Sequence, residues 1–362
     1  MTQRVRRLAP PRVYPRVDIV VSEAAEMIVG LAMVTGTDEN FDVGSSWFHE
    51  IRTNMGTDLA RLVALLQGSE SMQAVWHTLL AAVADAPACM PGFVEHLEAM
   101  PVDQLWLQLL GYHDQLDPSP ELREAMYAAG RGLVEPLERW FERDPSRSGR
   151  WIHGLARALG GDAAGARRVI LDLIVRWHEE VFAAQWEGIA PILERDAEEK
   201  RRLAAHRRPD EVVEEATQGG EYVPEVGISR LLLVPTYLGR PWVNLNRQRD
   251  TLVMVHPVGD AALAGSPEEA RRRQVLRLAK ALSDDTRLRA LRLMTGSSRS
   301  LQELADELGI RKSTMHHHLA VLRAAGLLRL RFFEKRYTLR TTPLDEMSGL
   351  LSEYLGEGRK RP

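Results

Sequence analysis

The chain of 362 residues contains a single cysteine, Cys89, so it has no intrachain disulfide framework. No apolar run approaches the roughly 18 residues that a membrane-spanning helix needs. The first twenty residues are basic and contain proline, and no apolar run of the secretory type follows them. These absences exclude a disulfide-stapled secreted domain. They predict a cytoplasmic protein without a membrane partner.

The motifs of common catalytic sites are also missing. The sequence has no glycine-rich phosphate loop ending in Lys-Ser/Thr and no G-x-S-x-G turn for a nucleophilic serine. Two His-Glu pairs, at residues 49–50 and 178–179, lack the second histidine that a zinc protease places one helical turn later. The sequence therefore predicts no enzyme, no catalytic residues and no cofactor.

The charge of the chain is distributed very unevenly. Hydrophobic residues make up 44% and charged residues 27%, which is typical of a soluble globular protein, and the overall charge is −3. Residues 271–340 nevertheless hold 17 lysines and arginines against 6 acidic residues, whereas residues 1–270 have a net charge of −13. A compact basic module on an acidic body is typical of a polyanion-binding domain attached to another domain.

Most of the acidic body has the periodicity of helices. Apolar residues three and four apart predict one helix face over residues 47–66, and further helices over 72–83, 121–141 and 163–186. The charged run 194–215 predicts a solvated helix with a break at Pro209. Short β-rich runs lie at 17–21, 229–234 and 251–256, and the last two are expected to pair across the loop 237–250.

The predicted fold is therefore mainly α. It has an N-terminal helical domain with a short β-hairpin, followed by a smaller α+β module. The expected boundaries are a flexible basic arm at 1–16, the helical domain at 17–260, a linker at 261–270, the module at 271–355 and a flexible tail at 356–362. All eight tryptophans precede the linker. They are interpreted either as core residues of a helical bundle or as walls of a ligand pocket.

The C-terminal module has the pattern of a helix-turn-helix. Ser300 is expected to cap a short helix at 301–308, and Gly309 stands where a helix stop favours a left-handed residue. A second helix, at 313–325, begins with polar residues and has an apolar inner face. Residues 327–332 and 336–341 then alternate as a two-stranded wing with basic residues on one face, and an amphipathic helix closes the module.

These segments resemble the ArsR/SmtB family of bacterial winged-helix repressors. The resemblance is carried by LAKALSDDTRLRALRLM, SLQELADELGIRKSTMHHHLAVLRAAGLL and the hairpin RLRFFEKRYTLR. It implies a homodimer joined through the first and last helices of the module, with the fourth helix in the major groove of DNA. The preceding segment is similar to larger family members whose N-terminal domain has no known role.

Ten residues are predicted to contact DNA. The exposed start of the fourth helix is expected to reach base edges through Lys312, Ser313, Thr314, His316 and His317. Phosphate contacts, which position the protein without reading sequence, are expected from Arg311, Arg329, Arg331, Lys335 and Arg336. Arg311 departs from the family pattern, which has a capping serine there. Either Ser313 caps the helix instead, or a phosphate holds its start.

The sequence predicts no metal site in the module. The segment 301–306 lacks the cysteines with which the family binds metals, and the closing helix lacks histidine. Consecutive residues of a helix point about 100° apart, so residues 316–318 cannot all face one ion, and His318 is expected to pack or to bind phosphate. A metal-responsive regulator remains an alternative.

The expected partners are a double-stranded DNA operator and a second copy of the chain. The module is interpreted as that of a repressor. Two alternatives stay open for the N-terminal domain: it senses a small-molecule effector, or it is purely an interaction scaffold.

Overall fold

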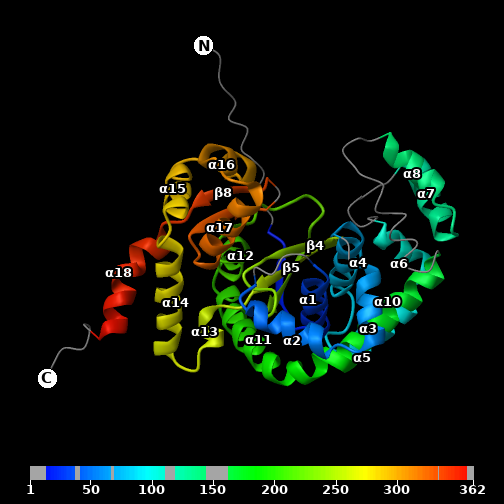
Figure 1. The fold of residues 1–362 in the computed structure, drawn as a ribbon, viewed down its shortest axis with the longest axis horizontal. Helices are drawn as coiled ribbons and strands as arrows, with labels where there is room; N and C mark the ends of the chain where they lie inside the picture. Colours follow the sequence, from blue (N-terminus) through cyan, green and yellow to red (C-terminus); the bar gives the residue numbers. More distant parts are fainter. Residues whose placement is uncertain are drawn as a thin grey trace, which may run out of the picture.

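The computed structural model describes residues 14–36, 41–66, 69–110, 119–143, 162–332 and 334–356. The predicted arm lies mostly outside these ranges, as does the tail beyond residue 356. The described chain is mainly α with some β structure, as predicted. The N-terminal portion surrounds a small sheet with helices, and the C-terminal module packs against it at one side (Figure 1).

Helices form most of the N-terminal portion. Their bounds, in chain order, are α1 Glu23–Thr35, α2 Gly44–Asn54, α3 Thr57–Leu66, α4 Ser69–Ala82, α5 Met90–Ala99, α6 Val102–Leu109, α7 Pro120–Gly130, α8 Glu135–Glu142, α10 Ala163–Trp177, α11 Ala183–Ala204 and α12 Pro209–Ala216. A π-helical turn, His178–Phe182, joins α10 to α11. The one helix predicted over residues 47–66 is two, because the chain is extended at Met55 and turns there.

The charged run is less solvated than its composition predicts. The break at Pro209 is confirmed, since α11 ends at Ala204 and α12 begins at Pro209. Asp196 and Lys200 of α11 are nevertheless buried, at 0% and 4% exposed. The Asp196 carboxylate accepts the Gly259 N–H at 2.7 Å and lies 3.6 Å from the Lys200 ammonium. The two buried charges are thus paired with each other, as buried charges in proteins usually are.

The N-terminal sheet has the strand order β1-β3-β5-β4. Its strands are β1 Arg16–Ile19, β3 Arg230–Thr236, β4 Asn244–Gln248 and β5 Thr251–Pro257. The predicted pairing of 229–234 with 251–256 exists, but β3 and β5 are parallel and do not form a hairpin. The hairpin is made instead by β4, inside the predicted loop, and β5.

The burial of β3 and β5 on both faces agrees with their parallel pairing. Leu232 and Val253 face the main helical core, while Leu231 and Leu252 face a second apolar cluster with α12. Strands covered on both faces are near-continuous apolar runs, which is the pattern of parallel central strands.

The C-terminal module has the helices and the wing that the sequence predicts, with a short helix, α13, and a two-residue strand, β6, in addition. The elements are α13 Asp260–Leu263, α14 Pro267–Leu282, α15 Asp285–Leu293, β6 Arg299–Ser300, α16 Leu301–Leu308, α17 Lys312–Ala324, β7 Leu328–Arg331, β8 Arg336–Leu339 and α18 Thr342–Leu355. Within the predicted linker, α13 and the start of α14 are helical, and Ser266 caps α14. The module has its own core, which includes Leu304, Met315 and Leu322.

A second sheet joins the two parts of the chain. Its order is β2-β7-β8-β6, and β2, Gly220–Glu221, follows α12 of the N-terminal portion. β2 pairs in parallel with β7, so the wing of the module is extended by a strand from outside it. In Figure 1, α18 lies on the outer side of the module, and α14 lies between it and the N-terminal portion.

Candidate nucleic-acid interface

The turn between α16 and α17 is built by local signals. The Ser300 hydroxyl accepts the Glu303 N–H at 3.2 Å, and the Glu303 carboxylate accepts the Ser300 N–H at 2.7 Å, which forms a capping box. Gly309 ends α16 in the left-handed region, with φ of 67°. This conformation favours glycine and directs the chain into α17.

Helix α17 presents one face to the module and the opposite face outward. Met315, Leu319 and Leu322 are buried in the module core. At 100° per residue, the outward face is centred on Ser313, His317, Ala320 and Ala324. This is the face that a recognition helix inserts into the major groove.

The start of α17 is open to solvent. The four residues Arg311, Lys312, Ser313 and Thr314 are all exposed. Arg311 occupies the N-cap position without a side-chain cap, and Ser313 lies inside the helix, so it is not the cap. The first backbone N–H groups of the helix are therefore available to an anion, and DNA phosphates are anions of this kind.

The N-terminal portion contacts α17 at His316, beside the outward face. The ring of His316 stacks on Trp242, with ring centroids 4.9 Å apart and ring planes 9° apart. His317 lines a pocket whose other wall includes Phe41 and Tyr237. Trp242 therefore covers one side of the His316 ring, whereas His317 is exposed at the edge of the pocket.

The arginines of β7 are engaged by carboxylates of the N-terminal portion. Arg329 donates to Glu214 at 3.0 Å, and Arg331 donates to Glu221 at 2.9 Å. The hydrogen bond with Glu221 is the main reason that the pKa of Arg331 is raised. Two of the five predicted phosphate contacts are thus paired with the N-terminal portion.

A close backbone approach accompanies these ion pairs. The Leu330 N–H donates to the Gly219 carbonyl at 2.9 Å. A Cβ at Gly219 would lie 2.2 Å from the Leu328 carbonyl oxygen, and Gly219 has φ of +113°. Only glycine suits both the conformation and the space. Phe332 also packs against the apolar cluster of α12 and the N-terminal sheet. We call this set of contacts, together with the Trp242–His316 stack, the closed arrangement.

The remaining wing residues differ from one another. Lys335 is exposed at the tip of the wing, with φ of 51°. Arg336 instead donates to Glu303 at 3.0 Å and to the Ser298 carbonyl at 2.8 Å. The Ser300 N–H, followed by Arg336, lowers the pKa of Glu303. Arg336 therefore stabilises the start of α16.

His318 packs inside the module, which is one of the two roles that the sequence predicted for it. Its side chain is 13% exposed and lies 3.8 Å from Asp284. Burial, which disfavours the charged imidazolium, lowers the pKa of His318. Within the described ranges, no three histidine, cysteine or carboxylate side chains gather in an arrangement that holds a metal ion.

The ten predicted DNA contacts thus fall into three groups. Residues 311–314, 317 and 335 are exposed, residues 316, 329 and 331 contact the N-terminal portion, and residue 336 is held inside the module. Sequence reasoning missed the covering residues, chiefly Trp242, Glu214 and Glu221. The available signal was the opposite charge of the two parts of the chain.

One comparison with known proteins identifies the module. Residues 282–331, from the end of α14 to the end of β7, match a family described as a helix-turn-helix domain. No curated protein and no solved structure matches the chain. The match supports a winged helix-turn-helix regulator that binds DNA. Among the described residues, no helix combines the length and the apolar character needed to cross a membrane.

Proposed function

We propose that this protein is a sequence-specific transcriptional repressor, not an enzyme, and that it binds its operator as a homodimer. The observation that carries the proposal is the exposed polar start of α17, inside the matched helix-turn-helix segment. Lys312, Ser313 and Thr314 bring donors and acceptors to the edges of bases. Arg311 and Lys335 flank them as phosphate contacts.

The outer helix of the module supports the homodimer. The last turns of α18 expose Leu351, Tyr354 and Leu355, which are 39%, 37% and 63% exposed. A contiguous apolar face of this kind is typical of a protein interface. Pairing of α18 with its copy would give a two-fold axis and place two α17 helices on half-sites about one helical turn of DNA apart.

The closed arrangement assigns the N-terminal portion a role in regulation. In it, His316 of α17 and both arginines of β7 are engaged by the N-terminal portion. We propose that the N-terminal portion must withdraw before the recognition helix enters the groove. The repressor is then an equilibrium between a closed form and an open, DNA-binding form.

Selection of duplexes from a random pool, followed by titration at several salt concentrations, tests DNA recognition. We expect an enriched two-fold sequence that binds with a steep dependence on salt. Equal binding of selected and scrambled duplexes would contradict sequence-specific recognition.

Light scattering after size exclusion tests the dimer. Leu355→Glu should yield monomers and weaken operator binding, because it places a charge in the proposed interface. Leu288→Glu is the matched control, since Leu288 on α15 is also exposed, at 48%. If both variants keep the mass of the unmodified protein, α18 is not the interface.

A further inference from the structure

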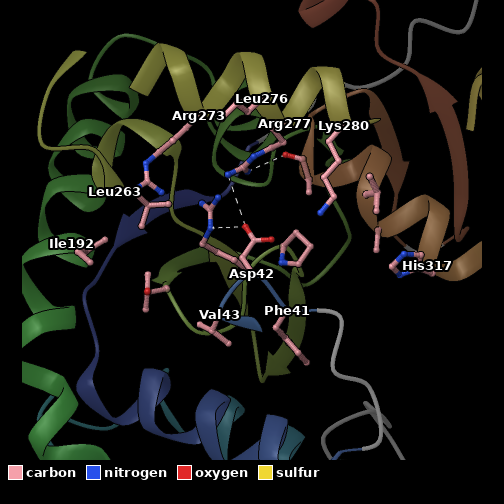
Figure 2. A pocket seen from close by; sticks show the side chains of 16 residues that line it. Phe41, Asp42, Val43, Ile192, Leu263, Arg273, Leu276, Arg277, Lys280 and His317 are labelled. Carbon is pink, nitrogen blue, oxygen red and sulfur yellow. Dashed lines mark hydrogen bonds and ion pairs between the residues drawn. The ribbon is translucent and has the colours of Figure 1, made fainter. Parts of the chain in front are cut away.

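A pocket of about 580 Å³ lies between α17 and the N-terminal portion. Small-molecule sites in proteins usually have volumes of about 300–1,000 Å³. Its walls come from α14, α17 and the segments that precede α2 and follow β3. Figure 2 shows Arg273, Arg277 and Lys280 extending from α14 into the pocket, with Asp42 opposite and His317 at the side of α17.

The pocket has more positive than negative charge. Its lining contains Arg240, Arg273, Arg277 and Lys280, and Asp42 is the carboxylate among the lining residues. Arg277 is paired with Asp260, and Arg273 is paired with Glu269 at 2.7 Å. No carboxylate in the described part of the chain pairs with the Lys280 ammonium. The pocket thus keeps a cation at its surface.

A buried arginine adds an unused donor. Arg240 is 1% exposed, and its Nε and Nη2 atoms bind Asp42 and Asp260 at 3.2 and 3.3 Å. Its Nη1 atom is buried and has no hydrogen-bond partner among the described residues. A buried donor without an acceptor costs free energy that an anionic ligand would recover.

Apolar side chains complete the lining. Phe41, Val43, Ile192, Leu263, Leu276 and Val321 contribute to it. Leu276 is 55% exposed although it lies beside these groups, so the pocket offers apolar surface to a ligand. A site with apolar walls and a few convergent cations suits a molecule with an apolar body and one anionic group.

We propose that this pocket binds a small amphipathic anion, an apolar body with a carboxylate, sulfonate or phosphate group, and that the ligand holds the closed arrangement. Lys280 and Arg240 receive the anionic group, and the apolar residues receive the body. Because the pocket needs both α17 and the N-terminal portion, the ligand binds the closed form in preference to the open form. The ligand therefore acts as an inducer that lowers DNA affinity, a role that rests on the proposed function.

Three probes test the chemistry of the site in the full-length protein. The fluorescent probe 8-anilino-1-naphthalenesulfonate has both parts of the ligand, N-phenyl-1-naphthylamine lacks only the sulfonate, and inorganic phosphate lacks the apolar body. We expect the sulfonate to bind at one site per chain and more tightly than the other two. Equal affinity for the neutral N-phenyl-1-naphthylamine would overturn the proposal that the pocket binds an anionic group.

Two variants locate the site. Lys280→Met should weaken sulfonate binding about tenfold, which is the scale of one charge-assisted hydrogen bond. The affinity for N-phenyl-1-naphthylamine should not change. Arg272→Met is the matched control, because it removes an equal charge from an exposed position of α14 that does not line the pocket. If the two variants bind the sulfonate equally, the probe is bound elsewhere and the site is wrong.

The link to DNA is measured separately. At ten times its dissociation constant, the sulfonate should weaken operator binding about tenfold in the unmodified protein and much less in Lys280→Met. Sulfonate binding at Lys280 without any change in DNA affinity would overturn the inducer role. If no duplex is recognised, the proposed function fails, while the probe titrations still decide whether the pocket binds anions.

Discussion

Breaking the ion pairs of the closed arrangement should increase DNA affinity. In Glu214→Gln/Glu221→Gln, the partners of Arg329 and Arg331 lose their charge. Each of these pairs is between one-third and one-half exposed, so it contributes about 0.2–1 kcal/mol. Loss of both lowers the closed-to-open ratio about 2- to 30-fold, since 1.4 kcal/mol is a factor of ten. The DNA dissociation constant falls by the same factor while the closed form dominates.

Fluorescence anisotropy of a labelled operator duplex measures this change. Glu95→Gln/Glu98→Gln is the control for net charge, because both residues are exposed on α5, which does not contact the module. Because Glu214 also lies 3.5 Å from Arg340, the same Gln substitutions should have no effect only when Arg329, Arg331 and Arg340 are already Gln, as a double-mutant cycle requires. An equal gain in affinity from the control pair, or a gain that survives loss of the arginines, would refute the argument.

Three further substitutions probe separate parts of the chain. Trp242→Ala should raise operator affinity about two- to tenfold in the same anisotropy assay, because the ring stack with α17 is worth about 0.5–1.5 kcal/mol; unchanged affinity would mean that the stack does not hold the closed form. Lys312→Ala should reduce discrimination between operator and scrambled duplex by about 1–3 kcal/mol. Lys335→Ala should instead weaken binding of both duplexes alike and lower the slope of log affinity against log salt concentration by about one. Identical behaviour of the two variants would contradict the division into base and phosphate contacts. Burial raises the pKa of Glu26 from 4.5 to about 7, so protonation of this carboxyl stabilises the fold. Its contribution to the free energy of unfolding is fully present below pH 4.5 and is lost as the pH rises through 7. In denaturant titrations, the unmodified protein should lose about 3 kcal/mol of its free energy of unfolding by pH 8, and Glu26→Gln should not show this loss. If the free energy of unfolding depends on pH in the same way in both proteins, the raised pKa is wrong.

The module was predictable because its signals are local. Ser300 and Glu303 are three residues apart, Gly309 ends a helix by its own conformation, and the wing alternates over a few residues. Each feature is decided by neighbours in sequence, so the elements appear at nearly the predicted positions. Arg311 is the exception, since the start of α17 has no side-chain cap.

The contacts of the N-terminal portion with the module were not predictable, because the residues that make them are far apart in the sequence. β2 has two residues, and its partner β7 lies more than a hundred residues later, so no periodicity marks the pairing. β1 and β3 are paired over a still longer separation. Trp242 could be interpreted as core or as a pocket wall from composition alone, and only the fold places it on His316.

The closed arrangement gives the uneven charge of the chain a physical meaning. The carboxylates Glu214 and Glu221 occupy the positions on Arg329 and Arg331 that phosphates would take, so the acidic portion competes with DNA for the same cations. Salt weakens both kinds of contact. A protein that opens before it binds therefore loses less affinity with salt than its phosphate contacts alone would dictate, because salt also favours opening. Its salt slope reports the phosphate contacts minus the internal pairs that they replace.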